Sequence, residues 1–213
     1  MNDLPKLKIH LFGKHKVGKT ALRNKIISEN DYQKDKIEPT KLVEFSTKTI
    51  NEKYTLLLID YPGDTKGANL FDYLDSAGLI CLIYDITNSK SFQDLRDEWI
   101  SFFERKNIIN ENTNRILVIA NKKDLYKNKD YSEFVEEEEG KTFAKQIGAD
   151  FLSISVENGN VDEILTYFVE KCKLNNFEDK KDIKDIKDIK DINDIKGVND
   201  KKVKESDYSC SCF

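Results

Sequence analysis

A glycine-containing segment near the start of the chain has the spacing of a loop that binds phosphate groups. Residues 13–20 read Gly-Lys-His-Lys-Val-Gly-Lys-Thr and match the pattern G-x-x-x-x-G-K-[ST], between a run that predicts a strand and one that predicts a helix. The backbone N–H groups and the helix start would surround the phosphates, Lys19 would reach their oxygens, and the Thr20 hydroxyl would coordinate Mg²⁺. A turn with a purely structural role is the alternative. The expected nucleotide contacts of this segment are Gly13, His15, Lys16, Val17, Gly18, Lys19, Thr20 and Ala21.

Residues 121–124, Asn-Lys-Lys-Asp, follow an apolar run and suit the recognition of guanine. Asp124 can accept hydrogen bonds from the N1–H and the exocyclic amine of guanine, a pair of donors that adenine does not present. The stem of Lys122 would lie against the ring, and Asn121 would tie neighbouring loops together. Alone, this pattern also suits an ordinary helix-capping turn. Together with the phosphate loop it favours guanine over adenine.

Two positions between these segments suit a metal ion whose binding depends on the nucleotide. Asp60 ends a predicted strand, where it can hold Mg²⁺ through water, and the N–H of Gly63 can meet a γ-phosphate. Thr40 offers a second hydroxyl, which would be bound only when the γ-phosphate is present. The loop around Thr40 and the segment after Gly63 are therefore expected to order with nucleotide state. Two ordinary solvated loops are the alternative for each position alone.

The composition excludes several classes of protein. A net charge of -4 and a pI near 5.4 leave no basic face for nucleic acid. No run approaches the roughly 20 apolar residues that span a bilayer, and the N-terminal residues lack the apolar core of a secretory signal. We therefore expect a cytosolic chain whose four cysteines are free thiols.

Short β-rich runs alternate with longer amphipathic runs, which predicts an α/β domain whose parallel sheet is covered by helices. The strands are expected at residues 7–12, 42–49, 54–60, 78–84, 115–120 and 151–155. The helices are expected at residues 19–29, 91–106, 134–147 and 161–174. Aromatic residues at helical spacing are expected to anchor the core, namely Phe92, Trp99, Phe102 and Phe103.

In order, these motifs resemble the Ras superfamily of small GTPases over about residues 6–174. Within it, the sequence Tyr-Asp-Ile-Thr-Asn at 84–88, followed by Ser-Phe at 91–92, is similar to the YDITN…SF stretch of Rab proteins. Residues 40–45, Thr-Lys-Leu-Val-Glu-Phe, resemble the Rab segment T-I-G-V-E-F. The resemblance implies a P-loop small G domain at 5–174, with a mostly parallel six-stranded sheet and helices on both faces.

The resemblance also assigns roles to single residues. Ser155 and the backbone of Val156 would help to hold the base, and Tyr32 would cover it. The implied catalytic residues are Lys19, Thr40, Gly63 and Asp64, and the implied Mg²⁺ ligands are Thr20, Thr40 and Asp60.

Three departures from the family pattern concern hydrolysis and affinity. Asp64 stands where the family has the glutamine that positions water; it is shorter, and its charge would repel the charge developing on the γ-phosphate. His15 and Lys16 replace the glycines of Ras where an activating arginine would approach. Val156-Glu157 replaces Ala-Lys beside the base. We expect nucleotide binding that is weaker than is usual, intact Mg²⁺ coordination, and slow hydrolysis.

The composition changes after Leu174, where residues 175–213 carry a KDI repeat and end in Cys-Ser-Cys-Phe. A period of three drifts against the helical period of 3.6, so a disordered tether is favoured over an amphipathic helix. The ending can be a C-a-a-X site with geranylgeranyl on Cys210, or a Rab-like C-x-C site in which Cys210 and Cys212 both carry lipid. A tail without lipid is the alternative. The tether is not polybasic, so charge adds little anchoring.

The sequence thus predicts a Rab-like switch that binds GTP, GDP and Mg²⁺ on the cytoplasmic face of intracellular membranes, with a cytosolic pool. Its expected partners are effectors, an exchange factor, a GTPase-activating protein, a prenyl transferase and the membrane itself. One alternative is a GTP-binding scaffold with negligible hydrolysis. A P-loop ATPase or kinase is a second alternative, which the guanine motif at 121–124 disfavours.

Overall fold

A computed structural model describes residues 4–28, 37–63, 78–105, 115–127, 134–174 and 178–179. All of these lie in one compact unit, Met1–Lys180, of the two into which the chain divides.

The sheet contains the six strands that the sequence predicts. They are β1 (Lys6–Phe12), β2 (Glu44–Ile50), β3 (Tyr54–Asp60), β4 (Leu79–Asp85), β5 (Ile116–Asn121) and β6 (Asp150–Ser153). Their order is β2-β3-β1-β4-β5-β6, and only the β2–β3 pair in this order is antiparallel. The expected mostly parallel sheet is therefore confirmed.

A short strand that the sequence did not predict, β7 (Glu178–Asp179), pairs antiparallel with the start of β1. It meets Lys6 and Leu7, whereas β4 pairs with β1 only from Ile9 onward. Strand β3 pairs with one edge of β1, and β4 pairs with part of the other edge. Strand β7 pairs with the part of that second edge that β4 does not reach. Two acidic residues carry no strand pattern, so their pairing follows from the position of the chain rather than from its local sequence.

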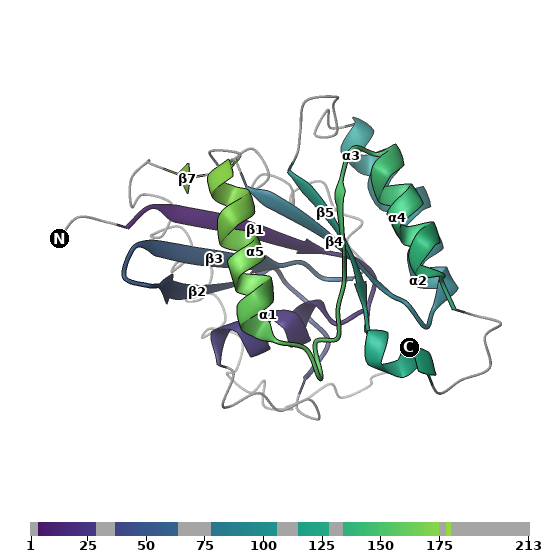
Figure 1. Ribbon diagram of the computed structural model, residues 1–213, viewed down its shortest axis with the longest axis horizontal. Helices are drawn as coiled ribbons and strands as arrows, with labels where there is room; N and C mark the ends of the chain where they lie inside the picture. The colour runs from purple at the N-terminus through teal and green to yellow at the C-terminus, as the bar shows by residue number, and fades with distance from the viewer. Residues whose placement is uncertain are drawn as a thin grey trace, which may run out of the picture. The chain divides into compact units, whose positions relative to one another are not determined.

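Helices cover both faces of the sheet, with α1 and α5 on one face and α2, α3 and α4 on the other (Figure 1). The helical elements are α1 (Lys19–Ile27), α2 (Ser89–Asp94), the π-helix η4 (Leu95–Ile100), α3 (Ser101–Arg105), the 3₁₀-helix η5 (Lys123–Lys127), α4 (Glu137–Gln146) and α5 (Val161–Leu174). The buried central strands β4 and β5 are apolar along their whole length because both of their faces are covered.

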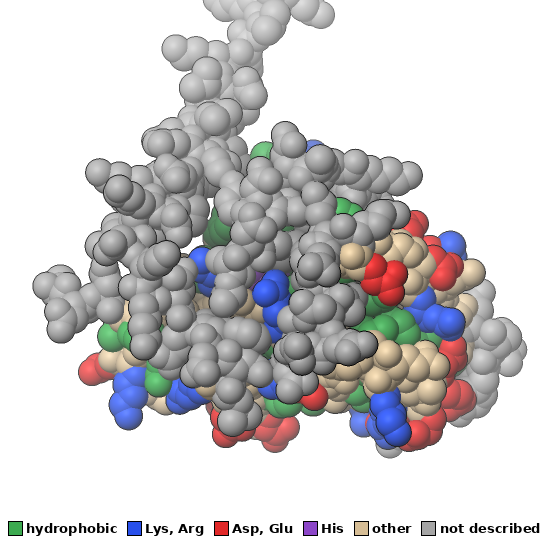
Figure 2. All heavy atoms as spheres, turned by 90° about the horizontal axis from the view of Figure 1, so that it is seen from above, with side chains coloured by type: hydrophobic (Ala, Val, Ile, Leu, Met, Phe, Trp, Pro, Cys, Tyr) green, Lys and Arg blue, Asp and Glu red, His purple; other side chains and the backbone are tan. Residues whose placement is uncertain are grey.

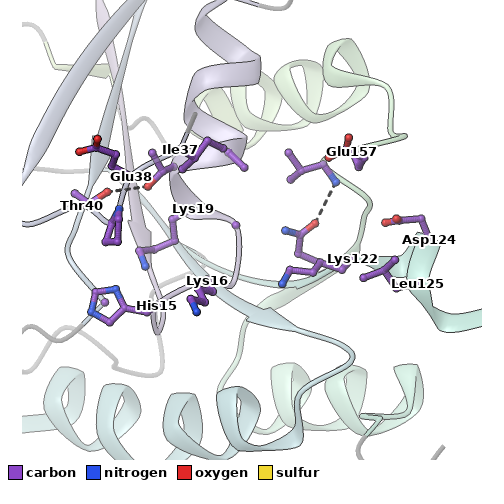
Figure 3. A pocket seen from close by; sticks show the side chains of 17 residues that line it. His15, Lys16, Lys19, Ile37, Glu38, Thr40, Lys122, Asp124, Leu125 and Glu157 are labelled. Atoms are coloured by element: carbon purple, nitrogen blue, oxygen red, sulfur yellow. Dashed lines mark hydrogen bonds between the residues drawn. The ribbon is translucent and has the colours of Figure 1, made fainter. Parts of the chain in front are cut away.

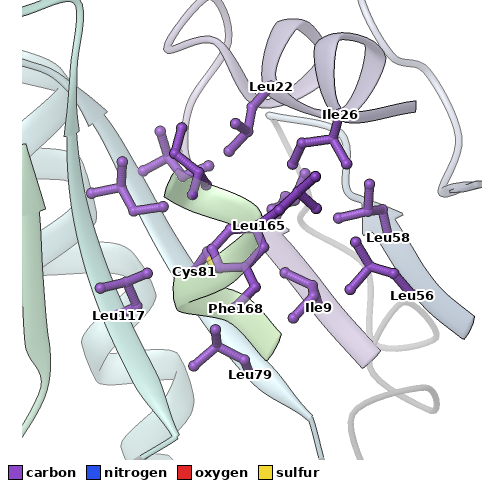
Figure 4. Packing of buried hydrophobic residues seen from close by; sticks show 14 of the residues in the cluster. Ile9, Leu22, Ile26, Leu56, Leu58, Leu79, Cys81, Leu117, Leu165 and Phe168 are labelled. Atoms are coloured by element: carbon purple, nitrogen blue, oxygen red, sulfur yellow. The ribbon is translucent and has the colours of Figure 1, made fainter. Parts of the chain in front are cut away.

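Alternate residues of the strands feed two separate apolar clusters. Leu56 and Leu58 of β3 face α1 and α5, where they pack near Ile9, Ile26 and Phe168 (Figure 4). Leu57 and Ile59 face the opposite way, toward the cluster of the four aromatic residues at 92–103. Phe92, Trp99 and Phe103 are buried and Phe102 packs against them, so their predicted core role is confirmed.

Several predicted boundaries were wrong. The helix expected at 91–106 starts two residues earlier and consists of α2, η4 and α3, because a run of six residues with apolar positions does not distinguish α from π winding. The helix expected from Phe134 begins only at Glu137, after Glu136 in an extended conformation, and its first turn carries three glutamates that favour a helix N-terminus. Strand β2 begins at Glu44 instead of Leu42, and β6 ends at Ser153 instead of Ser155.

Acidic and basic side chains are interspersed on the face of the molecule shown in Figure 2. Among the residues that the structure describes, no helix is both long and apolar enough to cross a bilayer. Cys81 and Cys172 are buried free thiols, as expected, and burial raises the pKa of Cys81 well above its usual value.

Candidate functional site

A cavity of about 600 Å³ opens where β1, β3, β4 and β5 end, at the edge of the sheet at which open α/β folds bind ligands. His15, Lys19 and Thr40 lie toward one end of this cavity, and Lys122, Asp124 and Leu125 toward the other (Figure 3). Its lining consists of His15, Lys16, Gly18, Lys19, Thr20, Ala21, Ile37, Glu38, Pro39, Thr40, Gly63, Asn121, Lys122, Asp124, Leu125, Val156 and Glu157.

The phosphate-loop segment leads from β1 into α1, as its sequence pattern requires. The buried ammonium of Lys19 donates hydrogen bonds to the carbonyl oxygens of Gly13 at 2.8 Å and of Lys14 at 2.9 Å. Lys16 takes a φ of 64°, a left-handed conformation that costs a residue with a side chain about 1 kcal/mol. The loop thus folds around its own lysine and directs a positive charge into the cavity.

Thr20, Thr40 and Asp60, which come from three different segments, converge at the start of α1. The Thr20 hydroxyl donates to Asp60 Oδ2 at 2.7 Å and lies 2.8 Å from the Thr40 hydroxyl, which itself donates to Asp60 Oδ2 at 3.3 Å. The structure thus brings the three predicted Mg²⁺ ligands within hydrogen-bond distance of one another.

The environment of Asp60 suits a cation. Its carboxylate is fully buried, and within the part of the chain that the structure describes no group forms a hydrogen bond with Oδ1. Burial raises the pKa of Asp60, against the hydrogen bond from Thr20 and the positive charges of Lys19 and Arg23. A buried carboxylate oxygen without a partner, beside two hydroxyls, fits the oxygen ligands that Mg²⁺ prefers.

The turn after β3 lies directly against the phosphate loop. A Cβ atom built on Gly63 would come within 2.3 Å of the backbone nitrogen of His15, so only glycine allows this approach. The backbone of Gly63 therefore lies beside the segment expected to hold the phosphates.

The other end of the cavity is held together by Asn121. Its side-chain nitrogen donates to the carbonyl oxygen of Val17 at 2.8 Å, and its side-chain oxygen accepts from the backbone N–H of Val156 at 3.1 Å. Asn121 thus links the phosphate loop, the end of β5 and the loop after β6, as predicted. Lys122 takes a φ of 68° and donates to Asp85 Oδ2 at 2.5 Å. Asp85 in turn accepts from the backbone N–H of Thr87 at 2.9 Å, so the Tyr-Asp-Ile-Thr-Asn segment positions Lys122.

The loop after β6 is held by a lysine that the sequence analysis missed. Lys25 of α1 is buried and donates to the carbonyl oxygens of Val156 at 2.6 Å and Glu157 at 2.8 Å. The family has a lysine where this chain has Glu157. In this chain the ammonium that contacts the same loop belongs to Lys25, which lies far earlier in the sequence. A basic residue on the buried face of α1 was the only local signal for this contact.

The cavity gathers most of the predicted contacts but not all. Gly13, Val17, Asp60 and Ser155 are not among its lining residues; Ser155 Oγ accepts from the backbone N–H of Asn158 at 3.0 Å. Tyr32, Asp64, Cys210 and Cys212 lie outside the described residues. Ile37 and Leu125 line the cavity but were not predicted, because a lone apolar residue in a loop carries no signal of a site.

Comparison with known proteins agrees with this arrangement. The Ras family model matches residues 8–174. The chain is 34% identical over 159 residues to the Ras-related protein RABA6a of Arabidopsis thaliana, which covers 72% of this chain and 64% of that protein. It is 30% identical over 171 residues to the Ras-related protein Rab-12 of Mus musculus, covering 78% and 66% of the two chains.

The Ras-related protein SEC4 of Saccharomyces cerevisiae is 28% identical over 170 residues, covering 74% of this chain and 71% of SEC4. The alignments to RABA6a and Rab-12 span slightly less than two thirds of those proteins. The match of the family model to residues 8–174, together with these relatives, shows that the chain belongs to the Ras family of small GTPases and has Rab proteins among its relatives.

Proposed function

We propose that residues 5–174, together with β7, which pairs with β1, form a G domain that binds GTP and GDP with Mg²⁺, and that residues 181–213 tether it to a membrane. One observation carries this proposal. The two hydroxyls suited to Mg²⁺, which both bond the buried carboxylate of Asp60, line one end of a cavity whose other end presents Asp124 and Lys122. The cavity volume lies within the range of small-molecule sites.

Within this proposal each residue has a definite task. Lys19, whose ammonium bonds two carbonyl oxygens of the loop, would bond phosphate oxygens, and Thr20, Thr40 and Asp60 would hold the metal. When bound, Mg²⁺ supplies neutralisation of the charge on the phosphate oxygens. Thr40 joins only with a γ-phosphate present, so the segment around it reports the nucleotide state to partners.

The role we propose is that of a Rab-like switch in vesicle traffic. Its effectors would meet residues 40–45 and the segment after Gly63, and its state would be set by an exchange factor and a GTPase-activating protein. The names of the relatives and the Rab-like segments at 40–45 and 84–88 support this role, which rests on likeness rather than on the site itself.

Hydrolysis is expected to be slow because Asp64 replaces glutamine. Single-turnover hydrolysis of γ-labelled GTP by the purified chain should give a rate at or below the order of 10⁻⁴ s⁻¹, as for an unassisted Ras-type site. Asp64→Gln should raise this rate. Asp64→Asn keeps the length of the side chain but removes its charge. If the hydrolysis rate also rises in this variant, the slow wild-type rate is due to charge repulsion.

A wild-type rate above that of Asp64→Gln would contradict this explanation and make Asp64 an effective water-positioning group. If all three proteins bind GTP and none hydrolyses it, the chain is the GTP-binding scaffold that forms the second candidate. His15 beside Gly63, in place of a smaller residue, favours that candidate.

Membrane attachment is expected to need lipid on the terminal cysteines. A single modest chain gives only reversible binding, with a partition constant of about 10⁴ M⁻¹ for myristoyl, and the near-neutral repeat adds little attraction. In cells with prenyl transferases, the double variant Cys210→Ser/Cys212→Ser should fractionate entirely with the cytosol, and intact mass should give the number of lipids on each protein.

The single variants separate the two lipid sites. A C-x-C site predicts partial attachment for either variant, whereas a C-a-a-X site predicts that Cys210→Ser abolishes attachment and Cys212→Ser has a mild effect. A double variant that still pellets with membranes would exclude lipid as the anchor and would assign attachment to the isoleucine-bearing repeat.

A further inference from the structure

A buried arginine lies beside the carboxylate proposed to hold Mg²⁺. Arg23 is one turn after Lys19 in α1, and its side chain is only 10% exposed. Its Nη1 atom lies 3.5 Å from Asp60 Oδ2 and also pairs with Glu44 Oε2. Its Nε and Nη2 atoms donate to the side-chain oxygen of Asn24 at 3.1 and 2.9 Å, which fixes the plane of the guanidinium.

Asp60 can therefore be paired by two different cations. Of the three proposed metal ligands, only Asp60 carries a charge, and it is fully buried, so screening by water there is weak. A guanidinium at ion-pair distance from Asp60 Oδ2 neutralises part of the charge that would attract Mg²⁺. The same guanidinium stabilises the carboxylate when the metal has left.

Glu44 shares the Arg23 guanidinium with Asp60. It is the first residue of β2, its side chain is 36% exposed, and its Oε2 atom pairs with the same Nη1 atom that lies 3.5 Å from Asp60 Oδ2. Glu44 belongs to the segment 40–45 that we expect effectors to contact. A partner that engages the Glu44 carboxylate would release the guanidinium toward Asp60.

We propose that Arg23 is an internal counter-cation that competes with Mg²⁺ for Asp60, and that Glu44 restrains this competition. Arg23 is thus a positioning residue that sets the metal affinity, and the Arg23–Glu44 pair couples the surface at Glu44 to nucleotide retention. This inference rests on the proposed nucleotide and Mg²⁺ site. It differs from a purely stabilising ion-pair network because it requires changes of opposite sign when either partner is removed.

The test is the dissociation rate of a fluorescent GDP analogue from the full chain across a series of buffered free Mg²⁺ concentrations. Arg23→Met, which keeps the apolar stem, should lower the Mg²⁺ concentration that half-suppresses release by about tenfold, because the competing charge is gone. Glu44→Gln should raise it by about threefold or more, because the guanidinium then pairs with Asp60 alone. In the double variant Arg23→Met/Glu44→Gln, the effect of Glu44→Gln should largely disappear.

Lys48→Met is the matched control, because Lys48 of β2 also joins that strand to α1, through a 2.6 Å bond to the carbonyl oxygen of Ile26, without touching Asp60. Lys48→Met should leave unchanged the midpoint, which is the Mg²⁺ concentration that half-suppresses release. If the rate of GDP release from the wild-type protein does not depend on Mg²⁺, the proposed metal site itself is contradicted. A Mg²⁺-dependent wild type with unshifted midpoints in Arg23→Met and Glu44→Gln would overturn only the role of Arg23. If Arg23→Met does not fold, an unshifted Glu44→Gln alone overturns it.

Discussion

Replacing Asp124 by asparagine is expected to change the preferred base from guanine to xanthine. Asp124 is the second residue of the short helix η5 at the cavity wall, where its carboxylate can accept two hydrogen bonds from guanine. The amide of asparagine can donate to the carbonyl that xanthine carries in place of the amine. Because a site built to bond a polar edge rejects a mismatched edge strongly, affinity for GTP should fall by at least about a hundredfold.

Competition of GTP and XTP for the wild-type and Asp124→Asn chains measures this change. Lys123→Ala is a suitable control, since the adjacent Lys123 ammonium is exposed and lies 3.4 Å from Glu137 of α4, away from the base. It should keep the wild-type preference. An Asp124→Asn chain that still prefers GTP to the wild-type degree would mean that Asp124 does not read the base.

Replacing Gly13 by alanine is expected to destabilise the domain severely. Gly13 has a φ of 142°, and a Cβ atom there would lie 2.1 Å from the carbonyl oxygen of Ile83 in the buried strand β4. Neither backbone can yield without disturbing the sheet, so the loss in the free energy of unfolding should reach about 3 kcal/mol or more. For a chain of this size the melting temperature should then fall by roughly 10 °C, or the protein should fail to fold.

Gly148→Ala separates the steric clash from the cost of a positive φ. Gly148 has a φ of 68°, but no atom of the described residues lies within 4 Å of a Cβ built there, so about 1 kcal/mol is expected. The comparison is made by thermal unfolding of the wild-type, Gly13→Ala and Gly148→Ala chains, each with the same nucleotide content. Equal melting temperatures for the Gly13 and Gly148 variants would contradict the close packing of the phosphate loop on β4.

The local sequence pattern was sufficient to predict the bounds of elements that are long and regular. The bounds of α5 and β3 agree with the predictions because apolar spacing and flanking polar residues mark both ends. The segment at 89–105 shows the limit of such reasoning, since the chain passes through π winding with no change in its apolar pattern. Loop motifs also located most of the cavity lining, because each motif carries its own chemistry.

Contacts between distant charged residues could not be predicted. Arg23 and Lys25 look like ordinary basic residues of an amphipathic helix, yet one meets Glu44 and Asp60 and the other meets the loop at 156–157. The partner of a buried charge is set by the packing of the sheet, which brings Lys25 to a loop 131 to 134 residues farther along the chain. Only the three-dimensional arrangement identifies them as part of the site.

The most direct test of guanine-nucleotide binding is calorimetric titration of the nucleotide-free full chain with GDP and with ADP, each with Mg²⁺ and with a chelator. The convergence of Thr20, Thr40 and Asp60 opposite Asp124 predicts GDP binding at least about a thousandfold tighter than ADP binding. It also predicts that removal of Mg²⁺ weakens the binding of GDP. Equal affinity for GDP and ADP, or GDP affinity unaffected by the chelator, would contradict a guanine-specific, Mg²⁺-dependent site.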